Sequence, residues 1–403
     1  MLRGVAQPLS IGLNLLFLTR DAGGVGTYVR GLVPALLHAE PGLRVTALAS
    51  RDVPPEDVAS PWGQEVQWVR APVGAEGAWG AAALRLGSQW IGLPALSALR
   101  RVDVIHGLAN IAPLVAPGAA TVVTLHDLIW LRREASMGPR DTLAMRLTAL
   151  PSVRMADRVL AVSAAARDDL VDTLGLDPDR VDVVPHGVGS EPLAHPVTET
   201  SMREALDLGN QPVVLCLAQK REHKNLAALI RALPALGDTR AVVVLPGAPN
   251  AYEEELRRLA DQLGVTDRVR FPPWLDESQI EGLFRMAACL ALPSFEEGFG
   301  LPVLEAMSRG VPVVCSDIPP LREVAGDAAL LFDPHDAAAL ADRLRSVLTD
   351  TRQAAVLRET GRRRAARFTW DRAAQQTLAS YRRAIDGRRL VSYDRRAAPS
   401  RSK

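Results

Sequence analysis

The stretch PSFEEGFGLPVLEAM, from Pro293 to Met307, decides the fold prediction because it joins the end of a strand to the start of a helix. The apolar run Leu290–Leu292 before it predicts a buried strand, and Leu301–Met307 predicts the first turns of a helix. Gly298 and Gly300 fall at the junction, where glycine lets the backbone approach a ligand and a helix start favours phosphate. This order of elements is typical of an α/β domain.

Two carboxylates flank this junction. Glu297 comes before the turn, and Glu305 lies eight positions later on the predicted helix. Because carboxylates accept hydrogen bonds from vicinal hydroxyls, the pair suggests a site for a sugar joined to a nucleotide by a diphosphate. The alternative is a helix start that carries surface glutamates, since strand–glycine–helix junctions are common.

The 403 residues alternate short apolar runs with longer helical patterns, such as Tyr252–Leu263 and Asp336–Leu348. The first series of predicted strands is Ser10–Leu18, Val45–Ala49, Val66–Val69, Val102–His106, Thr121–Leu125, Arg158–Val162 and Val181–Val184. The second series is Val213–Leu217, Ala241–Pro246, Val269–Phe271, Ala288–Leu292, Val311–Cys315 and Ala329–Phe332. Strands that are apolar on both faces and separated by helices predict two parallel sheets, each covered on both sides. The predicted boundary between them is the loop-rich segment from Gly187 to Gln211.

The stretch from Pro293 to Met307 resembles the Glu-x7-Glu motif of the retaining glycosyltransferases of family 4, which have the GT-B fold. The following SRGVPVVCSDIPPLREVAGDAALLFDP, from Ser308 to Pro334, also follows the family pattern. The likeness runs from about Ile11 to about Asp386. It implies an α/β protein of two doubly wound, Rossmann-like domains that face each other across a cleft.

The resemblance also predicts how the chain divides. We expect an N-terminal acceptor domain over 1–190, a C-terminal nucleotide-sugar donor domain over 191–368, and a helix over 369–386 that crosses back to the first domain. We expect 387–403 to be a basic, disordered tail. From Arg358 to Lys403 there are fourteen Lys or Arg and four Asp or Glu. This excess predicts either a solvated basic face or a weak attraction to an anionic membrane surface.

A glycine run, Gly23–Gly26, follows the first predicted strand and precedes a helical pattern. A glycine loop at a helix start suits a diphosphate, although a tight turn explains it equally well. The full Gly-x-Gly-x-x-Gly fingerprint is missing, which argues against a nicotinamide enzyme. In the family this loop lies near donor and acceptor, so the resemblance implies that Gly24 and Gly26 help to bind the donor.

His126 follows the strand Thr121–Leu125 at its carboxyl end, where ligands gather in open α/β sheets. A histidine there can donate a hydrogen bond to a sugar hydroxyl or to a backbone group, or it can form a structural pair with Asp127. Family members carry a histidine that contacts the donor sugar at this position. The resemblance therefore implies a catalytic, sugar-positioning role for His126.

Lys224 ends the loop AQKREHKNL after the strand Val213–Leu217. A cation there would neutralise the leaving diphosphate, although a lone loop lysine is usually solvated. Many family members have glycine in place of Ala218 and arginine in place of His223, so the source of a second positive charge is open. Lys220 or Arg221 of the same loop are the candidates.

Metal ligands and cofactors are not expected. Asp177-Pro178-Asp179 has the letters of an Asp-x-Asp metal motif, but it lies in a loop before Val181 and predicts a turn. We therefore expect a metal-independent reaction, in which protein donors stabilise the leaving diphosphate. No cofactor is expected beyond the nucleotide diphosphate sugar that serves as substrate.

Composition narrows the class of protein further. The net charge of +1 gives no overall attraction to nucleic acid, and 48% hydrophobic with 23% charged residues is typical of a globular protein. The isolated Cys216, Cys289 and Cys315 predict core thiols in a reducing compartment rather than zinc ligands or disulfides. We expect a cytoplasmic protein, with possible peripheral contact to the inner face of the membrane.

Taken with the resemblance, the motifs predict a retaining transfer of a hexose from a nucleotide diphosphate sugar to a hydroxyl of a sugar or lipid-linked glycan. GDP-mannose is the first expected donor and UDP-glucose the second. Glu297 would hold hydroxyls of the sugar and Glu305 those of the ribose. The backbone of Phe299, Gly300 and Leu301 would bind the sugar and phosphate. A nucleotide-sugar epimerase of related fold and a non-catalytic sugar-binding module are the alternatives.

Overall fold

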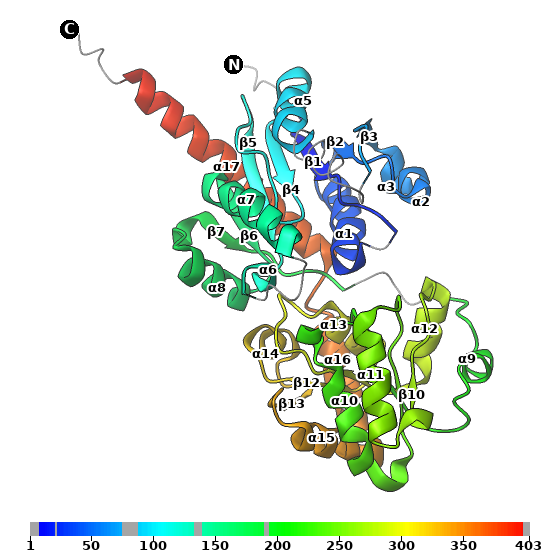
Figure 1. Cartoon of the computed structure of the whole chain (residues 1–403). Helices are drawn as coiled ribbons and strands as arrows, with labels where there is room; N and C mark the ends of the chain where they lie inside the picture. The colour runs from blue at the N-terminus through cyan, green and yellow to red at the C-terminus, as the bar shows by residue number, and fades with distance from the viewer. Residues whose placement is uncertain (1–7, 21, 75–87, 133–138, 189–192, 398–403) are drawn as a thin grey trace. The chain divides into compact units, whose positions relative to one another are not determined.

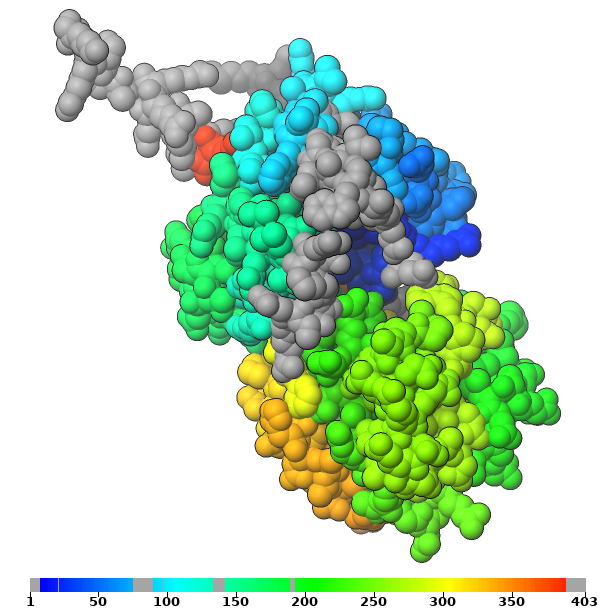
Figure 2. Space-filling model, in the orientation of Figure 1, coloured from blue at the N-terminus to red at the C-terminus, as the bar shows by residue number. Residues whose placement is uncertain are grey.

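The computed structural model describes residues 8–20, 22–74, 88–132, 139–188 and 193–397. The chain forms two compact units. The first unit contains Met1–Gly187 and Thr369–Lys403, and the second contains Val188–Phe368. Figure 1 shows each unit as a sheet covered by helices, and Figure 2 shows the same view with atoms drawn to size.

The first unit contains a seven-stranded parallel sheet in the order β3-β2-β1-β4-β5-β6-β7. Its strands are β1 Ser10–Leu15, β2 Arg44–Ala49, β3 Val66–Arg70, β4 Val104–Gly107, β5 Ala120–Leu125, β6 Arg158–Ala161 and β7 Val181–Val183. Its helices are α1 Gly23–Ala39, α2 Pro55–Ala59, α3 Pro61–Gln64, α5 Leu93–Arg100, α6 Ile129–Arg132, α7 Pro139–Met155, α8 Ala164–Leu174 and α17 Trp370–Ala397, with short turns η1 Ser88–Gly92 and η3 Pro178–Arg180. This is the strand order of a dinucleotide-type α/β fold, with its switch point between β1 and β4.

The second unit contains a six-stranded parallel sheet in the order β10-β9-β8-β11-β12-β13. Its strands are β8 Val213–Leu215, β9 Val242–Val244, β10 Val269–Arg270, β11 Ala287–Leu292, β12 Val313–Ser316 and β13 Leu330–Phe332. Its helices are α9 Glu199–Ala205, α10 Leu226–Ala232, α11 Ala251–Gln262, α12 Glu277–Met286, α13 Leu301–Ser308, α14 Pro319–Ala325, α15 Ala337–Thr349 and α16 Thr351–Ala365, with 3₁₀ turns η4 Glu222–Lys224, η5 Leu233–Thr239 and η6 Thr266–Arg268. The switch point here lies between β8 and β11.

The predicted fold class, two doubly wound α/β units, is confirmed. Each predicted strand corresponds to one strand of the structure, and the differences lie at the ends. The first strand stops at Leu15 rather than Leu18, because the backbone N–H of Leu18 turns back to the carbonyl of Leu15. The strands read as continuous apolar runs because helices cover both faces; every residue of β1 and β5 is buried.

Helix α17 completes the core of the first unit. Its residues Ala374, Leu378 and Tyr381 are buried in the same cluster as the apolar face of α1 and the strands β1, β2 and β4. The Tyr381 hydroxyl lies 2.7 Å from Nδ1 of the buried His106. The helix continues past Asp386, where we expected it to end, to Ala397. Residues 398–403 of the expected tail lie outside the described residues.

Two minor expectations are confirmed. The Asp177 carboxylate accepts a hydrogen bond from the N–H of Asp179 at 2.9 Å and begins the turn η3, as the turn prediction requires. Cys216, Cys289 and Cys315 are buried free thiols, and burial raises the pKa of each to about 12. Among the described helices, none combines the length and apolar composition needed to cross a membrane.

Candidate active site

The second unit brings two loops together at its topological switch point. One loop follows β8 and ends at Lys224, and the other follows β11 and contains Glu297. The Lys224 ammonium lies 2.8 Å from the Glu297 carboxylate. The two side chains are 16% and 11% exposed, so the pair is largely withdrawn from water but can still be reached by a ligand. The sequence predicted both residues, and the structure adds that they are direct partners.

Two residues that the sequence analysis did not place in the site fix this pair. The Ser294 hydroxyl donates to the same Glu297 oxygen at 2.8 Å. The Asn225 amide donates to the carbonyls of Pro293 and Pro334 at 3.1 and 2.8 Å, which ties the lysine loop to the loops after β11 and β13. Asn225 has a φ of +53°, a left-handed conformation that asparagine tolerates better than most residues. An asparagine directly before a helical pattern was the one sequence signal for this role.

Helix α13 begins directly after the second glycine of the motif. Gly300 has a φ of +108°, and a Cβ atom there would lie 2.5 Å from Cδ2 of Leu321, so both conformation and space require glycine. Leu301 is the first residue of α13 and carries the N–H that this helix start can offer, because Pro302 has no N–H and the N–H of Val303 donates to the carbonyl of Gly300 at 3.0 Å. Phe299 is buried, with its ring edge-on to Phe368. The predicted backbone donors therefore lie at a rigid helix start.

Glu305 lies on α13, one turn further along, and its carboxylate has no hydrogen bond or ion pair with the described part of the chain. Burial raises the pKa of this carboxyl above its usual value, while the nearby Arg309 charge opposes that shift. The Arg309 guanidinium is held by the buried Glu281 at 2.7 Å and lies over the Phe284 ring. A half-buried acid without a partner, next to a fixed cation, is suited to accept hydrogen bonds from ligand hydroxyls.

Lys220 is placed differently from our expectation. Its ammonium, only 1% exposed, lies 2.7 Å from the Glu253 carboxylate and donates to the carbonyl of Gly247 at 2.6 Å. Arg257 contacts the same carboxylate and stacks on Phe271. Because its donors are engaged inside the fold, Lys220 holds the loops after β8 and β9 together and is not a free cation for a donor phosphate.

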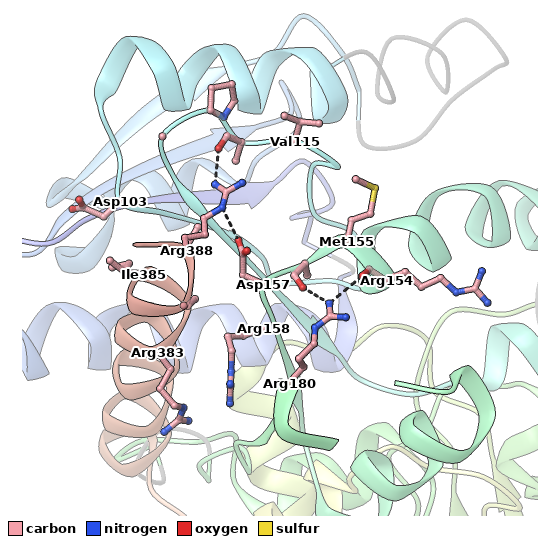
Figure 3. Close-up of a pocket in the computed structure, with 17 residues that line it drawn as sticks. Asp103, Val115, Arg154, Met155, Asp157, Arg158, Arg180, Arg383, Ile385 and Arg388 are labelled. Carbon is pink, nitrogen blue, oxygen red and sulfur yellow. Dashed lines mark hydrogen bonds and ion pairs between the residues drawn. The ribbon is translucent and has the colours of Figure 1, made fainter. Parts of the chain in front are cut away.

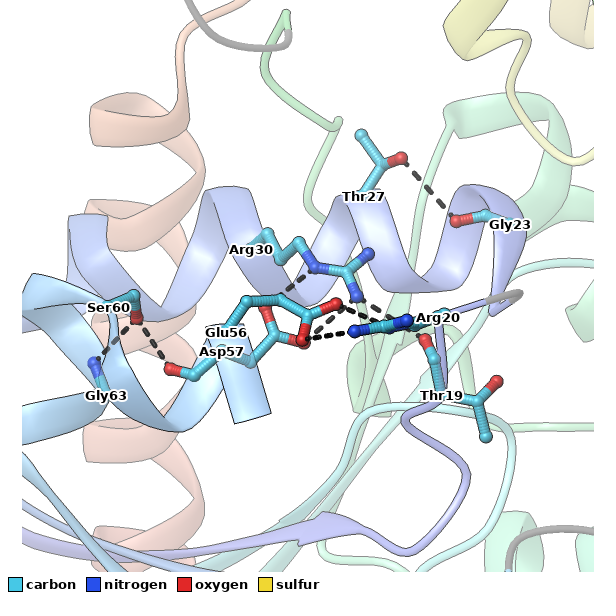
Figure 4. Close-up of polar contacts among 9 residues, drawn as sticks. All are labelled: Thr19, Arg20, Gly23, Thr27, Arg30, Glu56, Asp57, Ser60 and Gly63. Carbon is cyan, nitrogen blue, oxygen red and sulfur yellow. Dashed lines mark hydrogen bonds and ion pairs between the residues drawn. The ribbon is translucent and has the colours of Figure 1, made fainter. Parts of the chain in front are cut away.

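The first unit places its glycines within a helix rather than in a loop. Helix α1 begins at Gly23, so Gly24 and Gly26 form its first turn, and only Gly23 has a positive φ, of +56°. A Cβ on Gly26 would lie 2.9 Å from the Arg30 guanidinium. Figure 4 shows Arg30 joined to Asp57, with bonds of 2.8 and 2.9 Å. The expected glycine loop is thus a glycine-rich helix start, whose small residues make room for this ion pair.

His126 follows β5, and one of its two ring nitrogens is hydrogen-bonded to the backbone. Its Nε2 lies 2.8 Å from the carbonyl of Leu108, and a carbonyl can only accept, so Nε2 carries the proton. Burial lowers the pKa of His126 to about 4, so the ring is neutral at neutral pH and its Nδ1 is an acceptor. Tyr28 of α1 packs edge-on against it, with ring centroids 5.0 Å apart. His126 therefore donates to a backbone carbonyl, one of the two acceptors expected for it, and its other ring nitrogen can accept a hydrogen bond from a hydroxyl.

No cluster of three or more His, Cys, Asp or Glu side chains in the described ranges is arranged to hold a metal ion. The cationic and backbone donors near the switch point of the second unit, Lys224 and the start of α13, are the groups that could face a diphosphate.

Two family models match the sequence, one over each half of the chain. Glycosyltransferase Family 4 matches residues 22–191, and Glycosyl transferases group 1 matches residues 198–364. The D-inositol 3-phosphate glycosyltransferase of Salinispora arenicola is 31% identical over 401 residues, covering 91% of this chain and 88% of that protein. The chain belongs to glycosyltransferase family 4, and it is a glycosyltransferase that takes its sugar from a nucleotide sugar.

Two further comparisons support this placement. The O-antigen chain mannosyltransferase B of Escherichia coli is 29% identical over 266 residues, covering 65% of this chain and 70% of that protein. Among solved structures, sucrose-phosphate synthase from Thermosynechococcus elongatus is similar, with a TM-score of 0.74 and 21% identity over 94% of this chain and 100% of that one. The structural similarity confirms the GT-B fold.

Proposed function

We propose that this protein transfers a hexose, mannose or glucose, from a nucleotide diphosphate sugar to a hydroxyl of a sugar or lipid-linked glycan, with retention at the anomeric carbon and without a metal. The observation that carries the proposal is the Lys224–Glu297 pair at the switch point of the second unit. It places one cation and one carboxylate beside the glycine-started helix α13.

Each member of this group has a task in the proposed reaction. Negative charge grows on the leaving diphosphate as its bond to the sugar breaks, and the Lys224 ammonium and the N–H of Leu301 at the start of α13 stabilise it. Glu297, held by Lys224 and Ser294, accepts hydrogen bonds from sugar hydroxyls. Glu305 accepts those of the ribose, which supply the partners that its half-buried carboxylate lacks.

The first unit contributes a neutral histidine. In the proposed reaction, the Nδ1 atom of His126 accepts a hydrogen bond from a sugar hydroxyl and orients the ring, while its Nε2–H stays bonded to Leu108. No protein nucleophile enters this scheme. The leaving phosphate oxygen accepts the proton of the attacking hydroxyl on the face from which it departs.

The relatives suggest which substrates to test first. GDP-mannose remains the first donor, because one relative is named a mannosyltransferase, and UDP-glucose is second. The acceptor panel includes D-inositol 3-phosphate, after the name of another relative, together with simple sugars and lipid-linked glycans.

The test is a matrix of donors and acceptors in which free nucleotide and glycosylated product are both measured, with and without EDTA. The expected result is acceptor-dependent release of nucleotide that persists in EDTA, and a product whose anomeric configuration by NMR matches that of the donor. Loss of turnover in EDTA, restored by Mn²⁺ or Mg²⁺, contradicts metal independence. Nucleotide release without any acceptor favours an epimerase-like hydrolysis, and binding without turnover favours a sugar-binding module.

A weak membrane contact is also proposed. In η1 and α5, the described side chains of Ile91 and Leu99 are 72% and 82% exposed, whereas Leu93 is buried. Arg100 and Arg101 follow directly, and an exposed apolar pair beside basic residues suits an anionic interface. Vesicle sedimentation at low and high salt tests this, and equal recovery in the supernatant throughout contradicts it.

A further inference from the structure

A cavity of about 1020 Å³ lies wholly within the first unit. Its lining comes from the amino ends of strands: Asp103 precedes β4, Ala120 begins β5, Arg158 begins β6 and Arg180 precedes β7. His126 follows the carboxyl end of β5. At about 3.3 Å per residue, a six-residue strand puts roughly 20 Å between the two edges of the sheet. The cavity is therefore separate from His126, at the opposite edge of the same sheet.

Arginines dominate this cavity. Figure 3 shows the five that line it: Arg154, Arg158, Arg180, Arg383 and Arg388. The carboxylates within reach are fewer. Asp182 is shared by Arg158 at 2.5 Å and Arg383 at 2.9 Å, and Asp157 faces Arg388 at 3.4 Å. Asp103 accepts the backbone N–H of Ser10 at 2.9 Å. Positive charge thus exceeds negative charge around one concave space.

Two of the guanidinium groups have no carboxylate partner among the described residues. One nitrogen of Arg180 donates to the carbonyls of Arg154 and Ala156, which fixes the group and leaves its other donors unused (Figure 3). The exposed Arg154 side chain makes no hydrogen bond or ion pair in the described part of the chain. A guanidinium carries five N–H donors in a planar fork that matches a phosphate in two-point contact. Arg180 thus offers fixed and unused donors, which a phosphate site requires, and Arg154 adds an exposed positive charge beside it.

The size of the cavity is compatible with a ligand site. Pockets for small molecules usually enclose about 300–1,000 Å³, and this cavity of about 1020 Å³ lies at the top of that range. Internal packing defects are far smaller, since protein interiors are packed as densely as organic crystals. The space is large enough for a phosphate together with the group that carries it.

We propose that this cavity at the amino edge of the first sheet is a second binding site, which takes a phosphate-bearing group through Arg154, Arg158, Arg180, Arg383 and Arg388. The phosphate comes either from a soluble phosphate ester or from the head group of an anionic lipid. The rim carries exposed apolar side chains, Val115 at 58% and Met155 at 55%. These would contact the part of the ligand next to the phosphate. The site does not depend on the proposed sugar transfer.

Met155 offers a readout that distinguishes this site from a phosphate bound at Lys224. The chain has seven methionines, and Met155 lies on the cavity rim. In protein labelled with ¹³C at the methionine methyl groups, the Met155 signal is assigned with Met155→Leu. Titration with pyrophosphate or glycerol 3-phosphate should shift this signal in a saturable way. In the lipid arm, vesicles with phosphatidic acid should retain the protein and vesicles of phosphatidylcholine alone should not.

The matched variants are Arg154→Glu/Arg383→Glu in the cavity and Arg51→Glu/Arg70→Glu elsewhere on the same unit. Both change the net charge equally, and Arg51 and Arg70 are exposed. The cavity variant should weaken binding roughly tenfold or more, and the control should bind like the wild type. If the double variant does not fold, Arg154→Gln alone serves, because that side chain has no partner to lose. Two results overturn the proposal. The first is a Met155 signal that neither phosphate shifts, together with vesicle binding that is absent or is unchanged in the cavity variant. The second is a phosphate-induced shift that persists in the cavity variant.

Discussion

Two lysines of one loop, Lys224 and Lys220, have different surroundings although the sequence treats them alike. Lys224 meets Glu297 in a pair that a ligand can reach, whereas Lys220 is buried against Glu253. At the scale of single residues, replacing Lys224 should therefore change the reaction rate, whereas replacing Lys220 should change the stability of the fold.

Lys224→Ala should lower kcat by about 10²–10³ and change the donor KM much less, because the charge acts mainly on the diphosphate in the transition state. Steady-state kinetics on each donor that the wild type uses measure this. Arg231→Ala, on the following helix α10, is the control and should keep the wild-type rate. A Lys224→Ala protein with near-full kcat would reduce the lysine to a structural partner of Glu297.

Lys220→Ala should instead lower the free energy of unfolding, by up to about 3 kcal/mol, because it leaves a buried carboxylate with one cation fewer. Arg257 still contacts Glu253, so the loss should not exceed that value. Thermal or urea unfolding measures it. The double variant Lys220→Ala/Glu253→Ala should recover part of the stability, and a fully additive pair would argue against a direct interaction.

Glu305 should give donor binding a pH dependence. Burial raises the pKa of this carboxyl, and only the ionised form accepts from both ribose hydroxyls, so donor affinity should fall as the pH drops through that raised pKa. For the free protein the sign is opposite, since ionising a carboxyl whose pKa is raised costs stability as the pH rises. Calorimetry with the nucleotide across this range should show the loss in the wild type. Glu305→Gln should bind weakly at every pH, and an unchanged affinity contradicts the assignment.

The sequence pointed to Glu297 and Glu305 because their motif spans a single strand–helix junction, and to Lys224 because it ends the loop after another predicted strand. It did not point to Ser294, which bonds to Glu297 of the same loop, or to the contacts of Asn225 with Pro293 and Pro334, which lie in other loops. It left open which ring nitrogen of His126 carries the proton, because that depends on the carbonyl of Leu108 in the loop after the adjacent strand. Contacts of this range are set by tertiary folding and leave no local pattern.

At the scale of elements, helix α13 positions most of the proposed donor site and depends on Gly300. The apolar runs predicted the strands well because buried parallel strands need continuous apolar sequence. The starts of helices were harder to predict. The segment Gly23–Gly26 was expected to be a loop, and it forms the beginning of α1 instead. Glycine lowers helix propensity, but here its small size admits the Arg30–Asp57 pair.

Gly300→Ala should displace the start of α13 and weaken donor binding. The substitution meets a φ of +108° and a contact of 2.5 Å with Leu321, so it should cost more than the roughly 1–3 kcal/mol of backbone strain alone. Unfolding and nucleotide affinity are measured together. Gly264→Ala is the matched control, with a φ of +64° and nothing within 4 Å, and should show only the strain. Equal effects on nucleotide affinity would mean that α13 does not position the donor.

At the scale of the whole molecule, the chain builds its first unit from both ends of the sequence. The segment 369–403 belongs to the same compact unit as 1–187, although 181 residues of the second unit, 188–368, separate them. No apolar pattern in the sequence links α17 to α1, and only the family resemblance suggested that the last helix crosses back to the first domain. Trp370, the first residue of α17, packs closely against the rest of the first unit, since a Cβ atom on Gly31 or on Gly187 would overlap it.

A fragment of residues 1–187 should therefore fail to fold, whereas 1–187 joined by a flexible linker to 369–403 should fold. Without α17 the fragment loses the buried Leu378 and Tyr381 and the bond to His106. Each large core side chain removed costs about 2–5 kcal/mol, and several together exceed the 5–15 kcal/mol that typically holds a domain. Circular dichroism on heating should show a cooperative transition for the joined protein only. The fragment 188–368, which contains a whole sheet, is the control and should fold alone. If 1–187 unfolds cooperatively at the temperature of the joined protein, α17 is an accessory to the first unit and not part of its core.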